Sequence, residues 1–277
     1  MEDLRSIVAT MKTLSAVMLN QLESRLNQLN AFDRTTRLGL SAVLKNSPLL
    51  APASPPIEGA VAWIVIGAER GFCGRFNERI AEYLLAERCA DQDLPLLFFV
   101  GTRLSEKLLE YGLNCEGTAP LPATPEGLEQ LQETLLGKIN QWRNQGISQI
   151  NTIHTQRVEV SRFEIVDQIV WPISAEDLLD AQQADWPTRQ HPMVFDEPVE
   201  AIQFILRQML KTRLLLACVD SMACESGARL ANLQTAEENI DQRLDELNHL
   251  HNSQRQSAIT AELQDITAAF DLVLARD

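Results

Sequence analysis

The first 47 residues carry the pattern of one long amphipathic helix. They contain no proline and a single glycine, Gly39. Apolar side chains recur in steps of three and four residues, at Leu4, Ile7, Met11, Leu14, Met18, Leu22, Leu26 and Leu29. This spacing gathers them into one seam that needs a helical partner. We predict a helix from residue 2 to residue 46, ended by prolines that begin at position 48, because proline clashes with the preceding helical turn.

Residues 60–172 alternate between strand and helix patterns. Short apolar runs at 61–66 and 96–100 are bounded by Gly and Pro, which is typical of buried parallel strands. Two further strands are expected at 147–153 and 163–171. Helical patterns fill the intervals, at 77–89, 104–111 and 126–144. The alternation predicts a Rossmann-like α/β domain. The segment from Trp171 to Pro198 is rich in Pro and Trp and has little periodicity, so the connector, residues 173–198, is expected to be loop.

Residues 199–277 again lack proline and hold one glycine, Gly227. Apolar positions continue a helical spacing through the last third of this segment, at Ile240, Leu244, Leu247, Ile259, Leu263, Ile266, Phe270 and Val273. A helix of this length would expose an apolar stripe if it stood alone, so it should pair with the N-terminal helix. The predicted fold class is therefore α/β: a long antiparallel two-helix coiled coil formed by both chain termini, with the α/β domain inserted between them.

Charge and composition exclude several classes of partner. The chain has 277 residues and a formal net charge of −14. Nucleic-acid binding needs clustered Lys and Arg, so no nucleic-acid partner is expected. The same charge disfavours docking on an anionic membrane surface. No run of about 18 uncharged apolar residues occurs, so direct membrane insertion is not expected, and the acidic opening does not resemble a signal peptide.

The five cysteines and four histidines show no metal-binding spacing. Cys73, Cys89, Cys115, Cys218 and Cys224 form no CxxC pair, which favours free thiols in a reducing compartment over a disulfide framework. We expect no metal ion and no cofactor.

One segment has the position of a nucleotide-binding loop. Residues 67–74 follow a predicted strand and precede a helix, but they match neither GxGxxG nor GxxxxGK[ST]. Asp91 and Asp93 precede the second strand instead of ending it, where a ribose-binding acid would stand. Cys73 has no histidine nearby in the sequence to activate it. A tight turn with positive φ is the favoured interpretation, and we expect no catalytic residue here.

Three segments together resemble the gamma subunits of F-type ATP synthases. The sequence E-R-G-F-C-G-R-F-N at 69–77 is similar to that family's D-R-G-L-C-G-x-x-N loop. The C-terminal segments 225–230, 244–247 and 252–263 resemble its signature end, and the last of these is the most specific. The N-terminal resemblance is carried by Arg5, Ser6, Ile7, Thr10, Lys12 and Ala16.

The resemblance implies a central rotor shaft. In this family the terminal helices form a coiled coil inside a hexamer of alternating alpha and beta subunits. The α/β domain lies beside the epsilon subunit and on the membrane ring of c subunits. Rotation of the shaft couples ion flow through the ring to ATP synthesis or hydrolysis in alpha and beta, so this chain would be non-catalytic. The implied location is the cytoplasmic face of the plasma membrane, as a peripheral part of the complex.

The resemblance also assigns partner-contact residues. Arg255 and Gln256 fall where the shaft meets a beta-subunit loop, and Lys12 lies on the opposing helix facing beta. Leu263, Ile266 and Phe270 are expected to pack inside the bore of the hexamer. Ser15 and Met18 stand where the family has lysines, which favours steric over electrostatic contact with beta.

Two alternatives stay open at this stage. A non-catalytic coiled-coil scaffold would share the two-helix pattern, and an enzyme could use the 67–74 loop. The divergence of the chain also suits a second-copy, sodium-translocating ATPase. The sequence has no cysteine pair of the kind found in a chloroplast-type redox switch. The subunits that co-purify with the chain would separate these possibilities.

Overall fold

The computed structural model describes residues 2–46, 59–87, 96–122, 124, 127–159, 162–183, 186, 188, 192–194 and 197–274. The chain divides into two compact units, one made of Met1–Thr13 with Asn232–Asp277 and the other of Leu14–Ala231. In chain order the elements are α1 (Glu2–Asn46), β1 (Val61–Ile66), α2 (Phe76–Glu87), β2 (Leu96–Val100), α3 (Thr102–Glu110), β3 (Thr118–Ala119), α4 (Leu128–Asn144), β4 (Gln149–Glu159), β5 (Arg162–Trp171), α5 (Ala175–Gln183) and α6 (Pro198–Leu274).

The unit Leu14–Ala231 is built on one five-stranded sheet with the order β3-β2-β1-β4-β5. Strands β1 to β4 pair in parallel, and β5 returns antiparallel to β4. The predicted strands at 61–66 and 96–100 are confirmed. Strand β4 runs to Glu159, beyond the predicted end at 153, because its second half pairs with β5 as a hairpin.

Helices cover both faces of this sheet. On one face, side chains of β1 and β2 such as Val65 and Phe99 form a core with α2 and α3. On the other face, Ile64 of β1 joins α4 and the helices α1 and α6 in a second core. Alternate residues of β1 therefore point to opposite layers, as the period of two in a strand requires. The expected α/β domain is confirmed.

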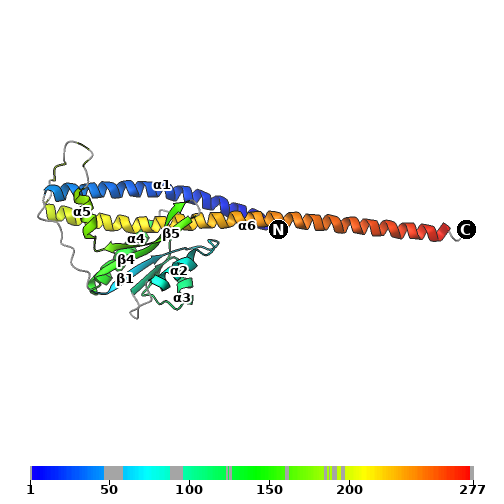
Figure 1. Cartoon of the computed structure of the whole chain (residues 1–277), viewed down its shortest axis with the longest axis horizontal. Coiled ribbons are helices and arrows are strands. Elements are labelled where there is room, and N and C mark those ends of the chain that lie inside the picture. Colours follow the sequence, from blue (N-terminus) through cyan, green and yellow to red (C-terminus); the bar gives the residue numbers. More distant parts are fainter. Residues whose placement is uncertain are drawn as a thin grey trace. The chain divides into compact units, whose positions relative to one another are not determined.

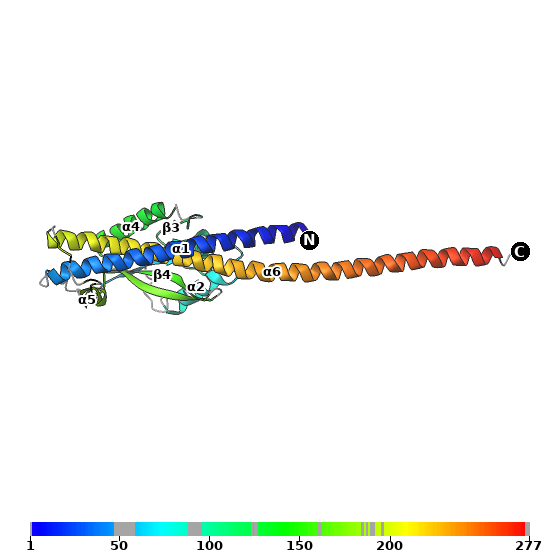
Figure 2. The same cartoon turned by 90° about the horizontal axis from the view of Figure 1, so that it is seen from above.

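Helices α1 and α6 lie side by side within this unit (Figures 1 and 2). Leu22 of α1 shares a core with Leu214 of α6, and Leu40 shares another with Ile202. In the unit Met1–Thr13 with Asn232–Asp277, Arg5 forms an ion pair with Asp241 at 2.8 Å. The partner numbers in α6 fall as those in α1 rise, so the pairing is antiparallel, as predicted.

The apolar seam of α1 is less buried than the pattern predicts. Leu4, Ile7 and Leu14 were expected on it but are 53%, 55% and 65% exposed, whereas Ser15, the neighbour of Leu14, is buried. Ser15 fits at the buried position because its side chain is small, and Leu19 and Leu22 continue the buried row.

The connector contains a helix, α5, where the sequence predicted loop. Ser174 caps this helix by accepting a hydrogen bond from the backbone N–H of Asp177 at 3.1 Å. Leu178 is buried against α1 and α6. The Asp177 carboxylate forms ion pairs with Arg37 of α1 at 3.3 Å and Arg213 of α6 at 2.6 Å. Burial between two helices therefore stabilises a segment whose own periodicity is weak.

Candidate functional site

The loop between β1 and α2 lies at the topological switch point of the sheet. Strand β1 pairs with β2 on one side and with β4 on the other, so the crevice beyond its carboxyl end is where open α/β sheets bind ligands. Residues 67–75 occupy this place.

The positive φ predicted for the loop falls on Phe72 (65°) and Gly74 (60°). Gly71 has no positive φ, and a Cβ added there would meet nothing within 4 Å. The expectation of a strained turn therefore holds for Gly74 and is wrong for Gly71.

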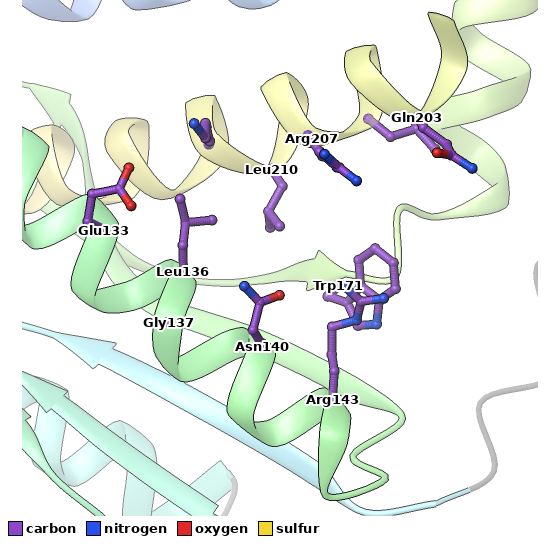
Figure 3. Close-up of a pocket in the computed structure, with 11 residues that line it drawn as sticks. Glu133, Leu136, Gly137, Asn140, Arg143, Trp171, Gln203, Arg207 and Leu210 are labelled. Atoms are coloured by element: carbon purple, nitrogen blue, oxygen red, sulfur yellow. The ribbon is translucent and has the colours of Figure 1, made fainter. Parts of the chain in front are cut away.

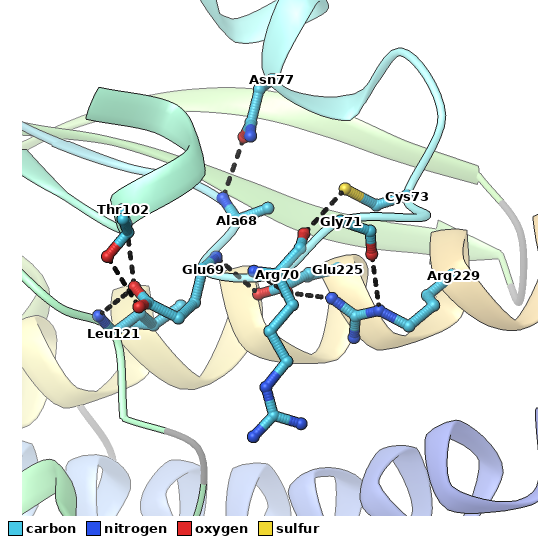
Figure 4. Close-up of polar contacts among 10 residues, drawn as sticks. All are labelled: Ala68, Glu69, Arg70, Gly71, Cys73, Asn77, Thr102, Leu121, Glu225 and Arg229. Atoms are coloured by element: carbon cyan, nitrogen blue, oxygen red, sulfur yellow. Dashed lines mark hydrogen bonds and ion pairs between the residues drawn. The ribbon is translucent and has the colours of Figure 1, made fainter. Parts of the chain in front are cut away.

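Three consecutive backbone N–H groups at the start of this loop are engaged by side chains of the protein itself (Figure 4). The N–H groups of Glu69 and Arg70 donate to the carboxylate of Glu225 on α6, at 3.3 and 3.1 Å. The N–H of Ala68 donates to the side-chain oxygen of Asn77 at 2.9 Å. Consecutive N–H groups of this kind bind phosphates in nucleotide enzymes. Here a carboxylate of the protein takes that position.

Arg229 completes the contact between the loop and α6. Its Nε donates to the carbonyl oxygen of Gly71 at 3.0 Å, and its guanidinium pairs with Glu225 one turn earlier. Glu225 is only 5% exposed and Arg229 only 8%. Such a buried ion pair holds the loop against α6, because separating the two side chains would leave an uncompensated buried charge, which is strongly destabilising. We call the loop, Glu225 and Arg229 the loop–helix lock.

Glu69 ties the lock to the rest of the sheet edge. Its carboxylate accepts hydrogen bonds from the backbone N–H of Thr102 at 2.8 Å and from that of Leu121 at 2.9 Å. The Thr102 hydroxyl adds a third bond at 2.7 Å. One side chain thus joins the segments that follow β1, β2 and β3. Its negative charge also interacts favourably with the positive end of the α3 helix dipole.

The thiol in this loop is not set up as a nucleophile. Burial, and next the negative charge of Glu225, raises the pKa of Cys73. Its Sγ donates to the carbonyl oxygen of Arg70 at 3.4 Å. His154 is buried, and desolvation lowers its pKa to about 4. Among the described residues, no cluster of three His, Cys, Asp or Glu side chains could hold a metal ion. Asp91 and Asp93 lie outside the described residues.

The predicted partner-contact residues belong to the other unit. Arg255 and Gln256 are adjacent and exposed on α6, and Leu263 is 59% exposed. Lys12 of α1 forms an ion pair with Glu237. Glu237 precedes Arg255 by 18 residues, or about 27 Å of helix, so Lys12 and Arg255 do not form one site. Ile266 and Phe270 lie in α6, but their side chains are outside the described part.

Sequence reasoning quoted Glu225 and Arg229 only as part of a family signature and gave them no role. Glu225 meets Arg70 across 155 positions of sequence. The local signal was an acidic and a basic residue four positions apart on a helix, which most often marks an exposed pair. Their position in the longest proline-free segment, among small residues such as Ser226 and Gly227, was the available hint of burial.

The fold and this site define a class: a two-helix protein with an inserted α/β domain whose ligand crevice is filled by its own helix. The model of the ATP synthase family matches residues 1–272. The chain belongs to this family.

The curated relatives of the chain include ATP synthase gamma chains from several bacteria. That of Haemophilus influenzae strain PittGG is 25% identical over 277 residues, covering 95% of this chain and 92% of the relative. That of Mycoplasmoides gallisepticum is 25% identical over 272 residues, with the same coverage. The match therefore extends over both helical ends and the α/β domain.

Solved structures show the same fold. A chain of the central stalk and c-ring of the Tetrahymena thermophila mitochondrial ATP synthase superposes with a TM-score of 0.59 at 18% identity. It covers 83% of this chain and 99% of its own length. A chain from the Euglena gracilis mitochondrial ATP synthase gives a TM-score of 0.57 at 12% identity, covering 96% of each chain.

None of the helices in the described part of the chain combines the length and apolar character that crossing a membrane requires.

Proposed function

We propose that this chain is the gamma subunit of an F-type ATP synthase, the central rotor shaft of the complex. The observation that carries the proposal is the match to gamma chains over 95% of the chain. The antiparallel pairing of α1 and α6 suits a shaft, because a two-helix coil transmits position along its axis. In this function, rotation couples ion flow through the membrane c-ring to ATP synthesis or hydrolysis in the alpha and beta subunits.

We propose the following division of labour. Residues 1–47 and 199–277 form the coiled coil that enters the alpha/beta hexamer. Residues 60–172 form the α/β domain, which faces the epsilon subunit and the c-ring, and residues 173–198 connect it to α6. The chain would lie at the cytoplasmic face of the plasma membrane as a peripheral part of the complex.

The chain itself is proposed to be non-catalytic. The loop–helix lock supports this view, because Glu225 already occupies the backbone donors that a nucleotide phosphate would need. Burial also disfavours the reactive thiolate form of Cys73, since it raises the pKa of that group. Titration of the isolated chain with ATP should therefore give no saturable binding at micromolar concentration. Tight binding would mean that the loop is a nucleotide site after all.

The contact residues remain part of the proposal. Arg255 and Gln256 would meet a beta-subunit loop, and Leu263, Ile266 and Phe270 would pack in the bore of the hexamer. Leu263 is 59% exposed, and exposed apolar surface of this kind often marks a site where another protein binds. Lys12 is engaged with Glu237 in the free chain, so its contact with beta would require sharing or exchanging that ion pair.

Affinity purification of the tagged chain from its own cells tests the function. We expect alpha and beta subunits to co-purify in equal amounts, each in threefold excess over this chain, together with epsilon and c. Recovery of the chain alone, or with a set of proteins lacking alpha and beta, would reject the rotor function and favour a scaffold.

A further inference from the structure

A groove of about 780 Å³ lies between α4 and the first turns of α6, within the unit Leu14–Ala231 (Figure 3). Its floor is apolar and is formed by Leu136, Leu206 and Leu210, with Trp171 at one end. Six of its eleven lining residues are exposed, so it is an open groove and not a closed cavity. Nothing in the loop–helix lock uses it.

The rim of this groove is basic on a chain that is strongly acidic. Arg143, Arg207 and Lys211 line it, against the single carboxylate of Glu133. The whole chain carries a net charge of −14. The Arg143 guanidinium stacks on Trp171, 4.0 Å from the ring centroid. Within the described part of the chain, no carboxylate forms an ion pair with these three cations. Their charge is therefore available to an acidic partner.

A glycine inside α4 leaves the groove open. Gly137 stands in the middle of this helix, where glycine is less favourable than alanine. It has no positive φ, and a Cβ added there would meet nothing within 4 Å. Neither backbone geometry nor packing within the chain therefore requires glycine at this position. A small residue on a helix surface lets the backbone of a second helix approach closely.

We propose that this groove is a docking site for an acidic amphipathic helix of a partner chain. The residues from Glu133 to Arg143 follow one face of α4 over about 15 Å, the length of about three helical turns. Apolar side chains of the incoming helix pack on Leu136, Leu206 and Leu210, over Gly137. Its carboxylates pair with Arg143, Arg207 and Lys211, in the helix-in-groove mode of recognition. The proposal rests on these residues and does not depend on the rotor function.

Photo-crosslinking in the assembled protein tests the proposal. A photoreactive phenylalanine derivative is placed at Gln203, on the rim, in the full-length chain expressed in its own cells. The matched control carries the same group at Ala86, an exposed residue of α2 on the opposite face of the sheet. Mass spectrometry then identifies the crosslinked peptide. We expect Gln203 to crosslink to one helical segment of another chain that carries acidic residues, and Arg207→Glu to lower the yield about tenfold.

Three results would overturn the proposal. These are crosslinks only to this chain's own connector, crosslinks only to lipid, and a yield at Gln203 no higher than at Ala86. The same sample reports separately on the proposed function. Loss of alpha and beta subunits with retention of an acidic helix in the groove would reject the rotor and keep the docking site.

Two substitutions at Gly137 separate docking from folding. Alanine and leucine are both good helix formers, so Gly137→Ala and Gly137→Leu should each raise the melting temperature of the isolated chain by about 2–4 °C. Only the leucine side chain fills the groove. We expect Gly137→Leu to reduce the Gln203 crosslink at least tenfold and Gly137→Ala to reduce it less than threefold. Equal yields in both variants would show that nothing approaches Gly137.

Discussion

Helix α6 is buried in one stretch and exposed in another, although the helix itself is continuous. Between residues 209 and 227 every side chain is buried or half-buried. Between residues 245 and 264 every side chain is exposed. Four large apolar side chains in the second stretch are between 42% and 59% exposed, namely Leu247, Leu250, Ile259 and Leu263.

The difference between these stretches lies in what covers them. The buried stretch is surrounded by α1, α4 and the sheet, and it carries small residues such as Ala217, Ser221 and Ala223 that allow close approach. A helix that is covered on all sides by the rest of the protein is part of the core. The exposed stretch carries an apolar stripe of which 42–59% of each large side chain is open to solvent. The first stretch thus stabilises the fold of the chain itself, whereas the second is suited to bind other proteins.

The largest expected effect comes from breaking the loop–helix lock. Glu225→Ala leaves Arg229 buried without its partner and leaves the N–H groups of Glu69 and Arg70 without an acceptor. We expect a loss of about 3–5 kcal/mol in the free energy of unfolding, measured by urea denaturation at pH 7. The control is Glu246→Ala in the exposed stretch, whose pair with Arg243 is open to water and should contribute little. Equal losses in the two variants would contradict the comparison.

A smaller effect of opposite sign is expected at Asp220 in the buried stretch. Desolvation raises the pKa of this carboxyl to about 6, only partly offset by the positive charge of Arg157. The folded state therefore holds its proton up to a higher pH than the unfolded state. The contribution of Asp220 to stability is therefore fully present below about pH 4 and is lost as the pH rises through 6.

Asp220→Asn removes this loss, so it should raise the free energy of unfolding at pH 7 by about 1–3 kcal/mol and change it little at pH 4. Asp245→Asn, in the exposed stretch, is the matched control for the loss of one carboxylate. A wild-type profile that rises between pH 4 and 6 relative to the Asp220→Asn profile would show the wrong sign for Asp220.

The next largest effect on stability is expected at Gly74, in the turn of the loop–helix lock. Gly74→Val places a β-branched residue at φ 60° and should destabilise the chain by about 1–2 kcal/mol. Gly71→Val should be nearly neutral, because that position has neither a positive φ nor a neighbour to collide with. Thermal melting of both variants measures the contrast. A larger loss at Gly71 would mean that the loop conformation differs from the one described.

The smallest effect on stability is expected at Arg255 in the exposed stretch, together with a clear effect on activity. Arg255→Ala should leave the melting temperature of the isolated chain within about 1 °C, since surface substitutions change stability little. It should slow ATP turnover by the assembled complex about tenfold if a charge-assisted hydrogen bond to beta is lost. Unchanged turnover in a destabilised chain would make Arg255 a residue of the fold.

Much of the architecture could be predicted from the sequence because it depends on local periodicity. The proline-free ladder at 2–46 predicted α1 without error, and the ladder that begins at residue 199 predicted the start of α6, at Pro198, to within one residue. The apolar runs at 61–66 and 96–100 predicted β1 and β2 without error. Strand β3 was missed because its two residues, Thr118 and Ala119, are too short to carry a pattern. Helix α5 was missed because tertiary burial stabilises it, although Ser174 and Asp177 are a recognisable capping pair.

The site was less accessible to sequence reasoning than the fold. The glycine loop was located correctly, and its turn was assigned to a structural role. Its actual partner, Glu225, could not be inferred, because contacts between residues more than 150 positions apart leave no periodic trace. The partner-contact residues Lys12, Arg255 and Gln256 were carried by family resemblance alone and stay predictions. The structure adds that Lys12 is already paired within the chain.

The antiparallel pairing of α1 and α6 also has a consequence for how the protein is made. Leu40 packs against residues of α6 that follow it by about 160 positions, and Arg5 meets Asp241 across 236 positions. At about 5–20 residues per second, the ribosome completes α1 roughly 8–30 s before the first covering turns of α6 exist. During that interval the α/β domain can form its sheet, while the seam of α1 stays uncovered. A nascent chain arrested before residue 198 should therefore expose this seam and depend on chaperones that bind apolar helices.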